Sequence, residues 1–194
     1  MMNLRIFPRM LTSHDEGWAW LMQIHPSVPK TYFLYVVPMS LIPPAMLLFT
    51  AYAYGDRVML GNVSPSEAWW LAGLFFAVEL LLVPIMGAVI QRIGDVVNAR
   101  PAYHDAFAFA AVVPTPLWLS AMALFVPSVS VNALATLAAL FASASMIYEG
   151  TYRLFQLKDE GPLLLLSGSI LAAGLVAWAG LMGLAFVGWS WIIA

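Results

Sequence analysis

Five stretches of the chain are long and apolar enough to cross a lipid bilayer as helices. A spanning helix needs roughly 20 mostly apolar residues to cross about 30 Å of hydrocarbon. Of the 194 residues, 62% are hydrophobic and 9% are charged, whereas soluble domains carry about 25% charged residues. The sequence therefore predicts an all-α fold, a polytopic membrane bundle of five transmembrane helices, at about 32–54, 69–90, 105–126, 131–148 and 163–192.

The chain divides into a short arm, residues 1–31, and a five-span membrane domain, residues 32–194. In the arm, Ser13 followed by Glu16 is the capping-box pattern that opens a helix. The apolar residues after it cover one wide arc of that helix: Trp18, Trp20, Leu21, Met22 and Ile24. We therefore expect an amphipathic helix in the membrane interface. A lipid anchor and a docking surface for a partner both fit this pattern.

The basic residues predict the direction of the spans, because Lys and Arg accumulate in cytoplasmic loops. Of the eight Lys and Arg residues, all but Arg57 lie before the first span, after the second or after the fourth. This places the N-terminus in the cytoplasm and the C-terminus on the opposite side of the membrane.

Prolines interrupt three of the spans. A helical proline lacks an N–H donor and leaves the carbonyl four residues before it without its usual partner. Such breaks either shape a bundle or mark a transport site. The prolines are Pro38, Pro43 and Pro44 in the first span, Pro84 in the second, and Pro114 and Pro116 in the third. The carbonyls of Met39, Ser40, Ala110 and Val112 are candidates to be freed near mid-depth.

The fourth and fifth spans carry small residues at helical spacing. Small residues let two helix backbones approach closely in a membrane. They are Ala135, Ala139 and Ser143 in the fourth span, and Ala173, Ala177, Gly180 and Gly183 in the fifth. The pattern predicts that these spans form either the tight part of the bundle or a dimer face, and the sequence leaves both open.

Glu79 is the one charged residue in the apolar stretch 73–87. A charged acid at the bilayer centre costs roughly 2.5–3.5 kcal/mol on insertion scales, so the neutral form costs less. A protonated carboxyl is a hydrogen-bond donor, and we expect it to reach a freed carbonyl of the first or third span. The alternative is a functional site that binds a proton or a cation.

Four titratable residues form a predicted polar cluster on the cytoplasmic side: His25, His104, Asp105 and Glu149. His104 and Asp105 could form half of a metal or acid–base site. Neighbours on a helix point about 100° apart, however, so we expect a polar helix start and no metal site. With no cysteine, no Gly-rich phosphate loop and no nucleophile elbow, the sequence predicts no catalytic residue, no cofactor and no nucleic-acid partner.

Three segments carry a resemblance to the Yip family, the Ypt/Rab-interacting five-span membrane proteins, and most closely to its bacterial branch. They are "HPSVPKTYFLYVVPMSLIPP", with Pro43 and Pro44, "RPAYHDAFAFAAVVPTPLWLSAM", with Phe109, Pro114 and Pro116, and "YEGTYRLFQLKDEG". The resemblance implies a non-enzymatic scaffold or interaction factor in the bacterial inner membrane, and the basic residues then place the C-terminus in the periplasm.

The N-terminal arm departs from the eukaryotic members of this family. Their acidic Asp-Leu-Tyr-Gly-Pro motif is absent, and the arm reads "HDEGWAW". We therefore expect no Rab-type GTPase as a partner, and instead membrane lipids together with another membrane protein or a second copy. The alternative function is a small proton- or cation-linked transporter or channel that uses Glu79 and the kinked first and third spans.

Overall fold

The structure is a computed structural model that describes residues 18, 21, 23, 25–54, 65–96, 99, 101–157 and 159–193, and the side chains of these except residues 65 and 189–193. The described residues are almost all helical and include no strand. Five segments are long and apolar enough to span a membrane: Val28–Tyr54, Ser66–Val96, Tyr103–Phe125, Val129–Phe155 and Glu160–Gly188. The predicted all-α bundle of five membrane helices is confirmed.

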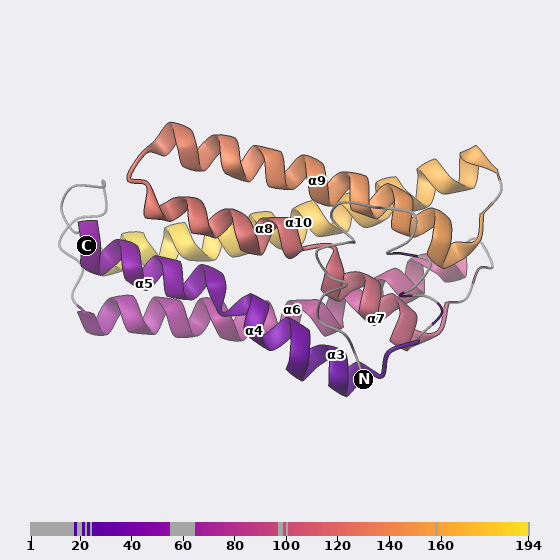
Figure 1. Cartoon of the computed structure of the whole chain (residues 1–194), viewed down its shortest axis with the longest axis horizontal. Coiled ribbons are helices and arrows are strands. Elements are labelled where there is room, and N and C mark those ends of the chain that lie inside the picture. The colour runs from indigo at the N-terminus through magenta and orange to yellow at the C-terminus, as the bar shows by residue number, and fades with distance from the viewer. Residues whose placement is uncertain are drawn as a thin grey trace.

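Two of the spans are built from several helical pieces, and three are single helices. The first comprises α3 (Val28–Thr31), the π-helical η2 (Tyr32–Val36), α4 (Val37–Ser40) and α5 (Ile42–Tyr54). The third comprises α7 (Tyr103–Val112), α8 (Thr115–Ser120) and the 3₁₀-helical η4 (Ala121–Phe125). The others are α6 (Pro65–Val96), α9 (Val129–Phe155) and α10 (Glu160–Ile193). Successive spans run in opposite directions along one elongated bundle (Figure 1).

The prolines act differently from span to span. The first span is interrupted at Leu41, just before Pro43, and the third is interrupted at Val113 and Pro114. In contrast, α6 continues through Pro84 without a break. The third span therefore has two halves, α7 and α8, with the interruption between them.

The most deeply buried element is α7, in which every residue from Ala106 to Val112 is buried. Within the described chain, 50% of the apolar window of the third span is buried inside the protein, against 22% for the fourth and 6% for the fifth. Of the two predicted roles for the fourth and fifth spans, a dimer face needs less burial inside one copy than the tight part of the bundle does. The small residues of α7, four of which are alanines, let neighbouring elements approach it from several sides.

Two residues of the N-terminal arm lie in this core. Trp18 and Leu21 are 1% and 3% exposed, and the Trp18 ring lies 5.2 Å from the ring of Phe109 between centroids. The sequence predicted an interfacial helix whose apolar arc contacts either lipid or a partner. Both side chains are packed inside the protein, and Trp18 fits there because Gly150 on α9 has no side chain to exclude it. Ser13, Glu16, Trp20, Met22 and Ile24 lie outside the described residues.

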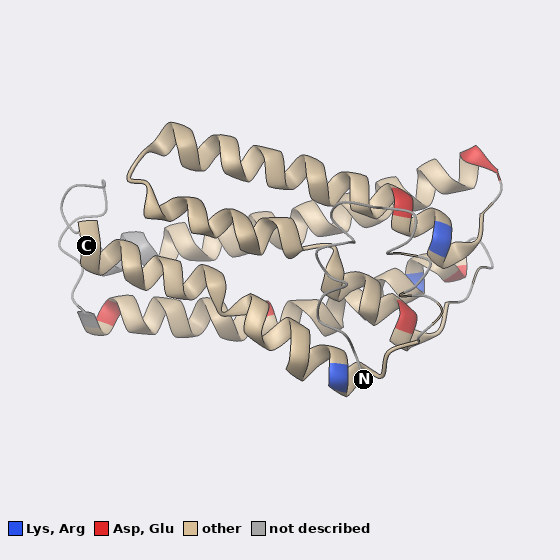
Figure 2. Ribbon diagram, viewed as in Figure 1, with Lys and Arg blue, Asp and Glu red and all other residues tan. Residues whose placement is uncertain are grey.

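Charged residues gather at one end of the bundle (Figure 2). This is the end where the first, third and fifth spans begin (Figure 1). The described basic residues, Lys30 at the end of α3, Arg92 on α6 and Arg153 in the last turn of α9, follow this arrangement. Arg5, Arg9, Arg57, Arg100 and Lys158 lie outside the described residues.

Candidate functional site

Glu79 lies inside the bundle, on the second span, and is 5% exposed. Its Oε1 atom accepts a hydrogen bond from the indole Nε1 of Trp118 on α8, at 3.1 Å. The carboxyl group thus joins the second span to the third. It does so as an acceptor from a side chain, whereas the sequence led us to expect a donor to a backbone carbonyl. Its Oε2 atom is buried without a hydrogen-bond partner among the described residues.

A second polar contact joins the first span to the third beside the proline interruption. The hydroxyl oxygens of Tyr35 and Thr115 lie 2.5 Å apart, and Thr115 donates to the carbonyl of Val112, also at 2.5 Å. Since a threonine hydroxyl has one hydrogen, Tyr35 is the donor to Thr115. The rings of Tyr35 and Trp118 lie 6.4 Å apart between centroids. The Tyr35–Thr115 and Glu79–Trp118 pairs therefore belong to one polar junction of three spans.

Two carbonyls that lie four residues before a proline accept hydrogen bonds from donors other than Glu79. Val112 lies four residues before Pro116 and is satisfied by Thr115. Leu80 lies four residues before Pro84, and its carbonyl accepts from the hydroxyl of Tyr32 at 3.3 Å. Leu80 was missing from the predicted set, although the four-residue rule would have identified it. Such donors are needed because lipid offers a freed carbonyl none.

Two further buried side-chain atoms have no hydrogen-bond partner among the described residues, and they belong to Ser40 and Glu149. The Ser40 side chain is fully buried, and its Oγ makes no hydrogen bond among the described residues. Ser40 precedes the interruption at Leu41 on the first span. The Ser40 hydroxyl can donate a hydrogen bond to a water molecule or accept one from it. Oε2 of Glu79 can accept such a bond or carry a proton.

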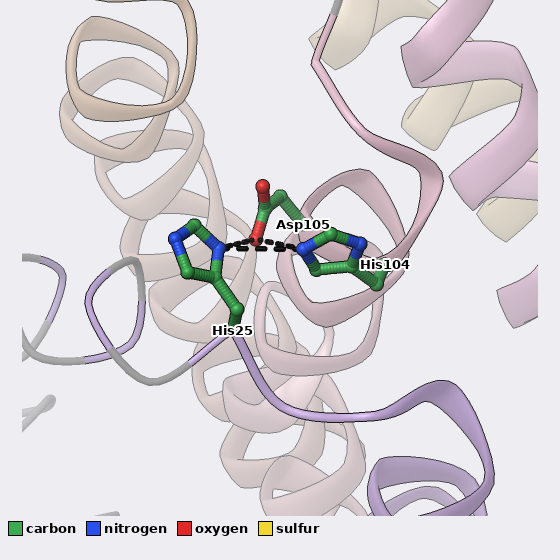
Figure 3. A group of neighbouring side chains, drawn as sticks. All are labelled: His25, His104 and Asp105. Atoms are coloured by element: carbon green, nitrogen blue, oxygen red, sulfur yellow. Dashed lines mark hydrogen bonds and ion pairs between the residues drawn. The ribbon is translucent and has the colours of Figure 1, made fainter.

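A separate cluster lies at the charged end of the bundle (Figure 3). Nδ1 of His25 lies 2.8 Å from Oδ1 of Asp105, and Nε2 of His104 lies 3.3 Å from each of these two atoms. His25 precedes α3, while His104 and Asp105 stand in the first turn of α7. The side chains of His104 and Asp105 converge, against our expectation for helix neighbours. Glu149, also predicted in this cluster, is not one of the three converging residues.

The remaining predicted residues differ in how far they are buried. Pro43, Pro44 and Phe109 are buried, while Pro114 and Pro116 flank the start of α8. Among the small residues, Ala139 is buried, Ala135, Ala173 and Ala177 are partly exposed, and Gly180 is exposed. A Cβ atom added at Gly180 would meet no atom within 4 Å.

Comparisons with known proteins agree with this architecture. The Yip1 domain matches residues 9–181 of the chain. The inner membrane protein YohC of Escherichia coli strain K12 is 34% identical over 187 residues, which cover 93% of this chain and 94% of the relative. The YohC protein of Escherichia coli O6:H1, strain CFT073, matches with the same identity and coverage. No solved structure matches the chain. Because the domain match and the relatives both extend over nearly all of the five spans, the chain belongs to the Yip1 family of multi-pass membrane proteins.

Proposed function

We propose that the protein acts without catalysis, as an interaction factor of the inner membrane whose fifth span packs against the fifth span of a second copy. The observation that carries this proposal is the uncovered small-residue face of α10. Only 6% of the apolar window of this span is buried inside the protein. The exposed small residues on it are Gly168, Ala172, Ala179, Gly180 and Gly183.

Spacing supports a helix–helix contact at this face. Ala179 and Gly183 are four residues apart, the small-xxx-small arrangement that lets transmembrane backbones approach closely. Added Cβ atoms at Gly180 and Gly183 would meet nothing within 4 Å. A helix facing only lipid gains nothing from small residues, since lipid does not require close backbone approach.

The second copy is the occupant that this face fits best. Two identical stripes of small residues match each other about a twofold axis, and twofold dimers are the commonest symmetric assemblies. Described residues on the outer half of α10 add no charged group that would select a different partner. The partner that we propose is therefore the same chain.

Gly180→Leu is expected to weaken the dimer about tenfold or more, because a leucine side chain holds the two backbones apart. The melting temperature of the monomer should stay close to that of the wild type, since Gly180 faces open space. Dimer fractions can be measured by fluorescence energy transfer between labelled copies in liposomes, over a range of protein-to-lipid ratios.

The matched control is Gly73→Leu on α6. Gly73 is exposed, and an added Cβ atom there also meets nothing within 4 Å, so this variant should dimerise like the wild type. A wild-type protein that stays monomeric at every ratio would refute the proposal. Crosslinking of α10 to a different membrane protein in native membranes, without self-association, would do the same.

The named relatives are inner membrane proteins, and we place this chain in the same membrane with its N-terminus in the cytoplasm. The basic residues support this direction. A reporter active only in the periplasm should give signal when fused after Ala194 and none when inserted near Arg153. The opposite result would reverse the topology.

Glu79 supports a second candidate function, a proton or cation pathway. The specific observation is that Oε2 of Glu79 and Oγ of Ser40 are buried without partners among the described residues. An acid inside a membrane is a functional hypothesis by default. We place this function second, because the Trp118 bond gives Glu79 a structural role that requires no transported ion.

Glu79→Gln is expected to leave stability close to that of the wild type, because the amide oxygen can still accept the Trp118 hydrogen bond. Glu79→Leu removes the acceptor. Hydrogen bonds between membrane helices average about 0.6 kcal/mol, with a maximum near 1.7, so this variant should lose stability within that range. Unfolding of both variants can be compared in detergent micelles.

The same two variants distinguish the second candidate. A proteoliposome assay with a pH-sensitive dye would show whether the wild type moves protons. Uptake by the wild type that disappears in a fully folded Glu79→Gln protein would favour the pathway, since an amide cannot release a proton. Equal stability of Glu79→Leu and the wild type would instead contradict the bracing role of the carboxyl group.

A further inference from the structure

We propose that His25, His104 and Asp105 form a binding site for one divalent transition-metal ion, with Zn²⁺ as the best fit. One ligand atom from each residue, Nδ1 of His25, Nε2 of His104 and Oδ1 of Asp105, lies within 4.8 Å of the other two. The three side chains point toward a common position (Figure 3). This site is independent of the α10 face and of Glu79.

The separations of the ligand atoms match a small coordination sphere. Zinc binds histidine nitrogen and carboxylate oxygen at about 2.0–2.2 Å, so two ligands on a tetrahedral ion lie roughly 3.3–3.5 Å apart. The two distances from Nε2 of His104 are both 3.3 Å. In the third pair, Nδ1 of His25 lies 2.8 Å from Oδ1 of Asp105. An ion would replace that direct contact, and the pair would have to open by about half an ångström.

The kinds of ligand select the class of ion. Two imidazoles with one carboxylate suit Zn²⁺ and its neighbours among the first-row transition metals. Mg²⁺ and Ca²⁺ prefer sets of oxygen ligands and are poor fits. The side chains of His25 and His104 are 57% and 39% exposed, and that of Asp105 is 13% exposed. Solvent can therefore reach the site and supply a water molecule as the remaining ligand.

The ligands come from two parts of the chain that the fold must bring together. His25 stands just before the first span, 80 residues from Asp105 at the start of the third. Its backbone has φ 44°, and in the described chain only Gln156 shares a positive φ among residues other than glycine. This left-handed conformation turns the chain between the arm and α3. A bound ion would fasten the arm, which carries the buried Trp18, to the start of α7.

The experiment uses the full-length chain, purified without a histidine tag, stripped of metal with a chelator and placed in lipid nanodiscs. Isothermal titration calorimetry with Zn²⁺ should show saturable binding of one ion per chain. An excess of Mg²⁺ should not displace it. Co²⁺ at the same site should give the visible absorption bands of a four-coordinate ion.

His104→Gln removes one imidazole ligand, and Asp105→Asn replaces the carboxylate ligand by a neutral amide, whose oxygen His25 can still contact. Each should weaken Zn²⁺ binding by more than the roughly 10–100-fold lost with an outer-shell partner. Glu149→Gln is the control, because Glu149 is an acid that does not belong to the group, and this variant should bind Zn²⁺ like the wild type. Size-exclusion profiles identify any variant that has not folded.

Absence of saturable Zn²⁺ binding in the wild type would overturn the site and leave an ion pair between His25 and Asp105. Equal affinities in the wild type, His104→Gln and Asp105→Asn would also overturn it, since the ion would then be bound elsewhere. The loss of affinity in only one folded variant would contradict a site of three ligands. A rise in melting temperature with Zn²⁺ in the wild type, absent in Asp105→Asn, would support it.

Discussion

Trp18→Ala should lower the free energy of unfolding by about 3–5 kcal/mol, the range for truncation of a large aromatic residue in a packed core. Trp18 is 1% exposed and packs against Phe109 on α7. Its removal leaves a cavity between the arm, α7 and α9 that the neighbouring helices can close only in part. Unfolding in mixed micelles of increasing denaturing detergent measures the loss.

Trp70→Ala is the control for this variant. Trp70 on α6 is 80% exposed, so its removal creates no cavity and should change stability by no more than about 0.5 kcal/mol. An equally small effect of Trp18→Ala would mean that the Trp18 side chain lies against lipid and is not packed in the protein core.

Gly150→Ala should destabilise the protein by about 1–3 kcal/mol through overpacking. A Cβ atom at this position would lie 2.5 Å from Cε2 of Phe109 and 2.8 Å from Cζ2 of Trp18. Both rings are buried, so neither can move aside without displacing further core residues. The loss should appear as a lower midpoint in the same detergent titration, and it should not add to the loss from Trp18→Ala, because the two residues are in contact.

Gly73→Ala provides the comparison at an open position. Gly73 lies inside α6 with nothing within 4 Å of an added Cβ atom, and alanine is favoured over glycine in a helix by roughly 1 kcal/mol. This variant should therefore be as stable as the wild type or slightly more stable. If Gly150→Ala and Gly73→Ala destabilise the protein equally, then overpacking against Trp18 and Phe109 is not the cause of the loss at Gly150.

Family membership carries less information about activity than about architecture. The Yip1 domain matches residues 9–181, and the structure has five segments long and apolar enough to span a membrane. Neither observation identifies an activity, because function resides in individual sites and not in folds. The α10 face, Glu79 and the His25 cluster can be tested separately because they lie on different elements.

The sequence by itself determined the number and approximate limits of the spans. A helix in lipid must satisfy its own backbone hydrogen bonds and must contain enough apolar residues to cross the bilayer. Both requirements are local, so they can be recognised in the sequence. The basic residues similarly predict a direction, and the intramembrane position of Glu79 is evident from its neighbours in the chain. None of these inferences depends on which helix packs against which.

Only the tertiary structure decided the contacts between spans. Small residues stand on α7, α9 and α10 alike, and their pattern does not indicate which face another helix covers. Likewise, the apolar arc around Trp18 fits lipid and protein equally well, since both exclude water. His25 and Asp105 are 80 residues apart, so their meeting depends on how the first and third spans pack. Side-chain packing is a property of the assembled bundle, and a local pattern in one helix cannot specify its neighbour.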